Sequence, residues 1–494
     1  MTDQEENQYN DIKKKAAKGM GWTYLSFGLA KILNLVTISI LARLLVPEHF
    51  GVVSLATLTM DYLSVINDLG LSAALIQKRE RIDESASIAF ILNVIAGAIL
   101  TLIIFLIAPY AALFFKEPQV TSVLQFLGLT FIITALGSVQ NVLLQRELNF
   151  RKKIIPEIGS TVIKAIISIS LAFAGFGVWA LVFGQLAGVA FSSLLLWIIV
   201  PWRPKLFWDS NIVKDMLKYG LSIMGNNAMS IWEDSFDYFV IGLIYTPTAL
   251  GVYTLAYKLP QTLVLNILWI MTAVLFPAFS SLQNQIDALK ESFLTVMRYV
   301  ELLVTPICLG MIIAADPLIR IAFGEQWLDA IPILRVLSLY VWVVSIGFHV
   351  GDVYKAIGRP DILIKTSIPM FIVRLILLWI GAQYSLVGVA YGHLVAGILS
   401  GILRFFVAAY FLKLTIWEFT KELTAFVCAV GLAALAIPTL YLTASTTPLL
   451  QLIAVIIAGA IGYLGTAWFI ERTAILTALQ TVGINLNLQR AESK

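Results

Sequence analysis

The sequence predicts an all-α membrane protein with fourteen transmembrane helices, arranged as two six-helix lobes plus two C-terminal helices. The first observation is composition: 59% of the residues are hydrophobic and 13% are charged, whereas a soluble domain carries about 25% charged residues. The second is a series of apolar runs of bilayer length. The third is the regular alternation of basic and uncharged gaps between those runs.

Each run is long enough to cross a bilayer, because the hydrocarbon core requires about 20 apolar residues in a helix. The third and ninth runs are longer than this, so we expect them to tilt or to extend beyond the membrane. In chain order the fourteen runs span residues 20–45, 51–76, 86–115, 120–144, 154–174, 177–200, 217–244, 250–279, 291–322, 330–354, 362–382, 386–411, 423–442 and 449–470.

Lysine and arginine predict the orientation, because cytoplasmic loops of membrane proteins are enriched in both. Counted from the N-terminus, the even-numbered gaps and the two tails hold the basic clusters, such as Lys78 to Arg81 and Arg151 to Lys153. The odd-numbered gaps near residues 175, 246, 384 and 445 carry no charge. Both termini are therefore predicted to be cytoplasmic, and the polar start of the chain does not resemble a cleavable signal peptide.

A repeat relates the two halves of the chain. The segment Leu41–Ala56 is echoed by Ile241–Ala256, at a constant offset that matches Pro47 with Pro247 and Gly51 with Gly251. Six spans separate the two copies, so the repeat is parallel and its pseudo-two-fold axis should lie along the membrane normal. The predicted parts are a cytoplasmic tail 1–15, an N-lobe 16–200, a cytoplasmic linker 201–211, a C-lobe 212–412, two further helices within 413–472 and a cytoplasmic tail 473–494.

Four helices carry polar residues at spacings of three and four, which place them on one helical face. They are the first two helices of each lobe, so the pseudo-two-fold would bring the four faces together around a hydrophilic central cavity. The polar residues are Thr23, Ser26, Lys31, Asn34 and Thr37; Ser54, Thr57, Asp61, Ser64 and Asp68; Ser222, Asn226, Ser230, Glu233, Asp234 and Asp237; and Thr254, Lys258, Gln261, Thr262 and Asn266.

Charged residues within the apolar runs cost about 2.5–3.5 kcal/mol each on insertion scales, so each needs a partner or water. Internal pairing, such as Lys31 with Asp61, is one interpretation of each residue. A solvated transport pathway is the interpretation favoured for the whole set. The deepest charges are Lys31, Asp61, Lys164, Glu233, Asp237, Lys258 and Arg374.

Two further groups of residues each allow two interpretations. His349 and Asp352 lie three residues apart and form either a structural hydrogen bond or a proton-responsive pair. Several aromatic residues either anchor helices at the membrane interface or stack on sugar rings. They are Trp22, Trp232, Tyr253, Tyr257 and Trp269.

Several function classes lack their sequence signatures. The chain has no G-x-x-x-x-G-K-[ST] phosphate loop, no His/Cys/Asp/Glu cluster with metal-ligand spacing, and no loop long enough for a catalytic domain. Its two cysteines, Cys308 and Cys428, both lie in apolar runs and indicate neither a disulfide framework nor a metal cluster. The prediction is a non-enzymatic protein without catalytic residues, cofactor, metal or nucleic-acid partner.

Several phrases, in this order and spacing, resemble Wzx-type polysaccharide flippases of the multidrug/oligosaccharidyl-lipid/polysaccharide exporter superfamily. The resemblance extends from about residue 16 to residue 420 and is greatest for the colanic-acid-type branch. The phrases are Leu41-Ala-Arg-Leu-Leu-x-Pro-x-x-Phe-Gly51, Asp68-Leu-Gly-Leu-x-x-Ala-Leu-Ile-Gln77, Asp237-x-x-x-Ile-Gly242, Leu250-Gly-Val-Tyr-x-Leu-Ala-Tyr257, Leu275-Phe-Pro-Ala-Phe279 and Phe323-Gly-Glu-x-Trp327.

The resemblance implies a multi-pass protein of the bacterial inner membrane that translocates an undecaprenyl-diphosphate-linked oligosaccharide for exopolysaccharide or O-antigen synthesis. It implies alternating access coupled to an ion gradient, and basic cavity residues that meet the diphosphate. The candidate substrate-binding residues are Lys31, Asn34, Asn226, Lys258, Gln261 and Arg374, and the candidate ion-coupling residues are Asp61, Asp68, Glu233 and Asp237.

The expected partners are the lipid-linked oligosaccharide, membrane lipid, and a polysaccharide polymerase with its chain-length machinery, with the chain itself a monomer. Three alternatives stay open. One is a peptidoglycan-precursor flippase, one is a drug or small-molecule cation antiporter of the same superfamily, and one is an assembly scaffold that transports nothing.

Overall fold

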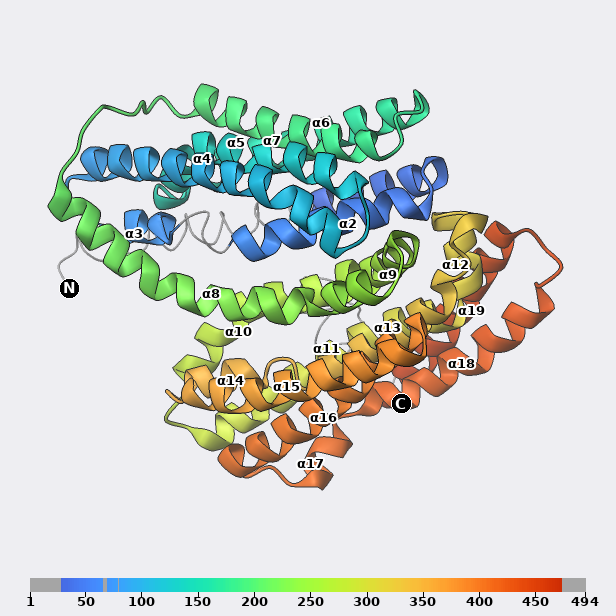
Figure 1. Cartoon of the computed structure of the whole chain (residues 1–494). Helices are drawn as coiled ribbons and strands as arrows, with labels where there is room; N and C mark the ends of the chain where they lie inside the picture. Colours follow the sequence, from blue (N-terminus) through green and yellow to red (C-terminus); the bar gives the residue numbers. More distant parts are fainter. Residues whose placement is uncertain (1–27, 65–68, 79, 473–494) are drawn as a thin grey trace. The chain divides into compact units, whose positions relative to one another are not determined.

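The structure is a computed structural model that describes residues 28–64, 69–78 and 80–472. Over residues 221–234 it describes the backbone but not the side chains. Within these residues every regular element is a helix (Figure 1), which confirms the all-α prediction. The chain divides into two compact units, Met1–Thr254 and Leu255–Lys494.

The first unit contains four long helices that lie side by side (Figure 1). Within this group α4 packs against α5, α6 against α7, and α5 also against α7. α2 and α3 pack against α8. The elements of this unit are a helix over 28–44, α2 (Pro47–Ser64), α3 (Leu71–Gln77), α4 (Ile82–Phe114), α5 (Gln119–Arg146), α6 (Phe150–Phe173), α7 (Val178–Ile199), α8 (Ser210–Ile244) and the first half of α9 (Pro247–Pro260).

The second unit is built around α11, which packs against α13 and α18. Two further pairs, α15 with α16 and α18 with α19, complete its main contacts. After α9 its elements are a π-helical turn η1 (Gln261–Leu265), α10 (Asn266–Ser281), α11 (Ile286–Ile313), α12 (Ala315–Ala322), η2 (Glu325–Trp327), α13 (Ala330–Ile346), α14 (Val350–Ala356), α15 (Asp361–Tyr384), α16 (Leu386–Leu412), α17 (Ile416–Lys421), α18 (Thr424–Leu442) and α19 (Pro448–Ile470).

Eleven helical segments of the described chain are long and apolar enough to cross a membrane. They coincide with eleven of the fourteen predicted runs, and large apolar side chains on them are exposed, as lipid-facing surfaces require. The other three runs, 20–45, 51–76 and 217–244, each include residues or side chains outside the described part. The chain is a multi-pass membrane protein, and the number fourteen stays a prediction.

Three of the predicted runs do not form one continuous helix, and these boundaries were wrong. In the second run the described part of α2 reaches Ser64, and α3 begins at Leu71 directly after Leu69 (φ 46°) and Gly70 (φ 68°), which are in the left-handed region. The ninth run contains two helices, because α11 ends at Ile313 and the short α12 is a separate element. The tenth run breaks between α13, which ends at Ile346, and α14, which begins at Val350. Turn-forming residues lie at the breaks, namely Gly70, Pro317 and Gly347, and a criterion based on the length of apolar runs does not weigh them.

The predicted linker 201–211 is tied to the loop before α4. Arg81 donates from Nη1 to Asp209 Oδ2 at 2.9 Å, and its guanidinium lies 5.8 Å from the centre of the Phe207 ring. Asp209 also caps α8, because Oδ1 accepts the backbone N–H of Asn211 at 2.9 Å. The backbone N–H of Asn211, together with the Arg81 guanidinium, holds the pKa of Asp209 below its usual value.

Candidate functional site

The two copies of the repeat meet at their prolines and glycines. A Cβ atom added to Gly51 would lie 1.7 Å from the carbonyl oxygen of Pro247, and one added to Gly251 would lie 2.0 Å from that of Pro47. Only glycine permits backbones to approach this closely. The contact is reciprocal, since each copy presents its glycine to the proline of the other.

A hydroxyl pair continues this contact one turn further along each helix. Ser54 Oγ lies 3.1 Å from Thr254 Oγ1, and these residues are 200 positions apart, which is the offset of the sequence repeat. In a two-fold repeat, equivalent residues of the two copies contact each other at the two-fold axis. The Ser54–Thr254 contact therefore marks where the pseudo-two-fold axis of this repeat passes. All these residues belong to the first unit, where α2 and α9 each begin at the proline of the repeat.

A buried carboxylate lies on α8 close to this contact. Asp237 is fully buried, and its Oδ2 accepts a hydrogen bond from the hydroxyl of Tyr253 at 3.0 Å. Tyr253 is also fully buried, with its ring edge-on to Tyr238 at 5.9 Å. The interpretation of Tyr253 as a sugar-stacking residue was therefore wrong, because its ring has no exposed face.

Two of the predicted ion-coupling residues lie around one tyrosine. Tyr62 on α2 is close enough to Asp61 and to Asp237 to interact electrostatically with both. Its ring also meets Phe239 edge-on at 6.5 Å, as expected from the packing of α2 on α8. We call Asp61, Tyr62, Asp237 and Tyr253 the acidic cluster. The sequence analysis singled out its two carboxylates but assigned no role to Tyr62.

The remaining predicted site residues lie on several helices of the two units. Lys31 and Asn34 are half-buried in the helix 28–44 of the first unit. In the second unit Lys258 lies near the end of α9, Gln261 in η1 and Arg374 in α15, all half-buried. Asp68 lies outside the described residues, as do the side chains of Asn226 and Glu233. The roles of these residues stay predictions.

Internal pairing accounts for some of the other polar groups. Lys164 Nζ donates to Gln185 Oε1 at 2.6 Å and joins α6 to α7. The predicted pair of His349 and Asp352 forms its hydrogen bond, with 3.1 Å between Nδ1 and Oδ2. Lys355 Nζ approaches the other oxygen of Asp352 at 3.4 Å.

The sequence analysis missed two buried carboxylates, Glu301 and Glu471. Glu301 lies on α11 with 0% of its side chain exposed. Its Oε1 lies 2.7 Å from the hydroxyl of Ser345 on α13. A signal was present, because Glu301, Thr305 and Cys308 are spaced by four and three and share one helical face. The strongly apolar run around Glu301 concealed it.

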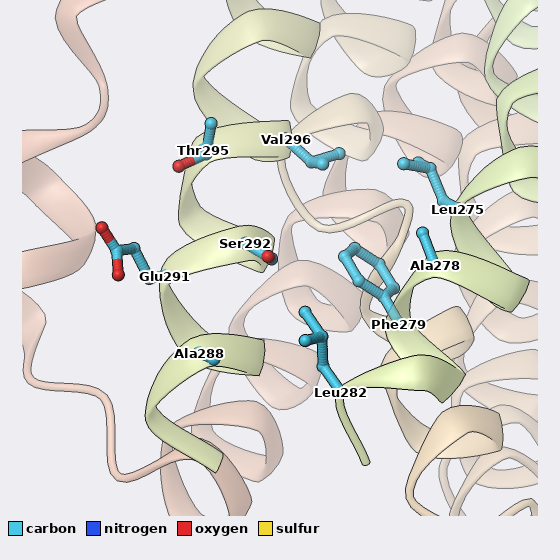
Figure 2. A pocket seen from close by; sticks show the side chains of 9 residues that line it. All are labelled: Leu275, Ala278, Phe279, Leu282, Ala288, Glu291, Ser292, Thr295 and Val296. Carbon is cyan, nitrogen blue, oxygen red and sulfur yellow. The ribbon is translucent and has the colours of Figure 1, made fainter. Parts of the chain in front are cut away.

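The cavity in Figure 2 lies between the end of α10 and the start of α11. It has a volume of about 450 Å³. Ser292 and Val296 point towards Phe279, whereas Glu291 points away from it (Figure 2). None of the predicted substrate-binding residues lines this cavity. Among the described residues, no group of three or more His, Cys, Asp or Glu side chains is placed to hold a metal ion.

Comparison with known proteins places these features in a family. Residues 40–332, more than half of the chain, match the family described as "Polysaccharide biosynthesis protein". The teichuronic acid biosynthesis protein TuaB of Bacillus subtilis is 25% identical over 415 residues, which cover 83% of this chain and 86% of TuaB. The lipopolysaccharide biosynthesis protein WzxC of Escherichia coli is 24% identical over 403 residues, covering 80% of this chain and 81% of WzxC.

The fold has a close counterpart among solved structures. The lipid II flippase MurJ, in an inward closed conformation, superposes with a TM-score of 0.69 at 16% identity, over 92% of this chain and 99% of MurJ. The similarity to WzxC and the family match confirm the predicted resemblance to Wzx-type flippases. The chain belongs to the polysaccharide biosynthesis protein family.

Proposed function

We propose that this protein is a flippase that moves a lipid-linked oligosaccharide from the cytoplasmic to the outer leaflet of the bacterial inner membrane. The observation that carries this proposal is the family match over residues 40–332. The relatedness to WzxC along most of both chains and a fold shared with a lipid II flippase support it. The exported glycan would serve exopolysaccharide or O-antigen synthesis.

The substrate headgroup would be an undecaprenyl diphosphate bound by lysines. Lys31 and Lys258 are half-buried cations. Each lies on one of the four predicted polar helix faces, which we call the polar stripes. An ammonium group binds phosphate as a compact point charge. Arg374 would assist them, while Asn34, Asn226 and Gln261 would contact sugar hydroxyls. The polyprenyl chain would stay in lipid, where its apolar surface costs nothing to solvate.

Ion coupling is assigned to the carboxylates of the polar stripes. Asp61 and Asp237 lie around Tyr62 in the acidic cluster, and Asp68 and Glu233 belong to the same predicted set. Carboxylates within membrane spans commonly form proton or cation relays. Their protonation would bias an alternating-access cycle of the proposed lobes 16–200 and 212–412.

In the proposed topology both termini are cytoplasmic, so the turns at Pro47 and Pro247 lie at the outer face. The reciprocal glycine–proline contact would then close the repeat at that face in this structure. The protein would act as a monomer without catalysis, and it would supply a polysaccharide polymerase and its chain-length partner. Catalytic residues, cofactors and metals have no part in this mechanism.

The diphosphate role is tested by replacing both lysines with alanine (K31A/K258A) in a strain that depends on this protein for glycan export. We expect export to be lost while the amount of protein in the membrane is unchanged. The matched control is K152A/K421A, which removes one exposed lysine from each unit and should leave export intact. Normal export by K31A/K258A would contradict the role, and arrest of peptidoglycan synthesis would favour the peptidoglycan-precursor alternative.

A further inference from the structure

We propose that Glu301 is a proton-binding site of the second unit, which takes up and releases a proton during the transport cycle. This inference rests on the proposed function and adds a site on α11, outside the predicted polar stripes. Asp61 and Asp237 lie in the first unit, whereas Glu301 lies in the second.

Glu301 lies in a polar seam between two packed helices. On α11 the seam consists of Glu301, Thr305 and Cys308, and on α13 of Ser338, Trp342 and Ser345, each set spaced by four and three. The indole N–H of Trp342 donates to Thr305 Oγ1 at 3.0 Å across the seam. Glu301, Thr305 and Ser345 are almost completely buried.

The hydroxyl of Ser345 gives an ionised Glu301 little stabilisation. Ser345 Oγ lies 2.6 Å from the carbonyl oxygen of Trp342 and 2.7 Å from Glu301 Oε1. A serine hydroxyl has one hydrogen, and neither a carbonyl oxygen nor an ionised carboxylate donates. The Ser345 hydroxyl donates to Glu301 Oε1, but it shares its single hydrogen with the Trp342 carbonyl oxygen, so it offers a buried negative charge on Glu301 less than one full hydrogen bond.

No positive charge neutralises Glu301 among the residues that the structure describes. Its Oε2 has no hydrogen-bond partner there. Arg298, one turn earlier on α11, is held by Glu471 and Glu422. An ionised carboxylate in this position would carry the full cost of an unpaired buried charge.

The titratable groups found near Glu301 in the described part of the chain are a thiol and a phenol, both of which are uncharged at pH 7 at their ordinary pKa values. Cys308 from α11 and Tyr463 from α19 are those close enough to interact with it electrostatically, and α13 presents Ser345 and Trp342. The hydroxyl of Tyr463 donates to the carbonyl oxygen of Leu302 at 2.9 Å. Because only neutral hydroxyl, thiol and indole groups surround the carboxyl, the site suits a proton and lacks the several oxygen ligands that a metal cation requires.

Release of the proton from Glu301 would therefore be coupled to a change in the packing of α11 against α13. Once ionised, Glu301 needs water or a cation that the packed α11–α13 interface does not supply. Separation of the two helices would admit water, and reprotonation would allow them to pack again. A buried carboxyl group thereby links the protonation state to the packing of the second unit.

The proton on Glu301 is tested by infrared difference spectroscopy of the protein in lipid vesicles. We expect the wild type to show a carbonyl band of a protonated carboxylic acid that is absent from E301Q and fades as the pH is raised. The control is E291Q, which removes an exposed carboxylate of the same helix and should keep the band. An identical spectrum for wild type and E301Q, or a band unaffected by pH, would overturn the proposal.

Coupling is tested with the same vesicles, loaded with an undecaprenyl-diphosphate oligosaccharide. An imposed proton gradient should accelerate flipping by the wild type and by E291Q, whereas E301Q should flip at equal rates with and without it. Gradient-stimulated flipping by E301Q, or stimulation of the wild type by sodium alone, would overturn the coupling role. No flipping by the wild type would count against the proposed function, and the infrared titration would still decide whether Glu301 binds a proton. If E301Q does not fold, the same comparison is made with Glu301→Asp, whose carbonyl band should differ from that of the wild type; an unchanged band would overturn the proposal.

Discussion

Buried polar residues of this protein depend on partners from a neighbouring helix. Asp237 was predicted because its spacing places it on the polar stripe, yet its partner Tyr253 was assigned a different role. Spacing shows which residues share a face of one helix, but not which side chain of another helix meets that face. The sequence analysis overlooked Glu301 for another reason, because the strongly apolar run around it concealed its polar face, and its contact with Ser345 was missed with it.

Loss of the Tyr253 hydroxyl should weaken the acidic cluster. Tyr253→Phe removes a hydrogen bond to a buried carboxylate, and removing one partner of a buried hydrogen bond costs about 1–3 kcal/mol. The midpoint of thermal unfolding in detergent should therefore fall. The control is Tyr410→Phe, which removes a hydroxyl from a side chain that is 80% exposed. Equal unfolding midpoints for the two variants would show that the hydrogen bond contributes nothing.

Asp209 should make stability depend on pH. Its folded-state pKa lies below the usual value because of the Asn211 N–H and the Arg81 guanidinium, so its contribution is present above the unfolded-state pKa of about 3.9 and is lost as the pH falls through the folded-state pKa. The difference in unfolding midpoint between wild type and Asp209→Asn should be largest at neutral pH and should shrink on acidification. A difference that grows as the pH falls would contradict this assignment.

At the scale of elements, glycines set where helices cross. Gly51 and Gly251 abut the proline carbonyls of the opposite copy, and Gly70 and Gly220 make a second close approach between the start of α3 and α8. The sequence repeat indicated that the Pro–Gly turns are equivalent, but not that they touch. Gly70 before α3 and Pro317 in the first turn of α12 are local signals for these breaks, which a prediction based on the length of apolar runs did not use.

The crossing of the two copies should be detectable by a disulfide. The double substitution Ser54→Cys and Thr254→Cys replaces hydroxyls that lie 3.1 Å apart, so mild oxidation should link α2 to α9. Adding Gly51→Ala should slow this cross-linking, because the new Cβ would lie 1.7 Å from Pro247 O and the backbones must separate. The control Gly310→Ala, with no atom within 4 Å of its Cβ, should leave the rate unchanged. Equal rates for both glycine variants would contradict the close contact.

At the scale of the whole molecule, composition and hydropathy predicted an all-helical, multi-pass membrane protein, and the structure confirms it with eleven segments of membrane-spanning length. The structural units divide at Thr254, within α9, because α8 and the start of α9 pack against α2 and α3. The lobes 16–200 and 212–412 stay a proposal. Sugar recognition was not predictable, since scattered Asn, Gln and Ser side chains carry no sequence code for a particular glycan.

Flipping of a defined lipid-linked oligosaccharide by the purified protein in vesicles tests the central claim most directly. A labelled undecaprenyl-diphosphate oligosaccharide should move between leaflets when the wild-type protein is present, and K31A/K258A should reduce its rate to that of empty vesicles. K152A/K421A should keep the wild-type rate. A wild-type rate no faster than that of protein-free vesicles, with correctly folded protein in the membrane, would contradict the account.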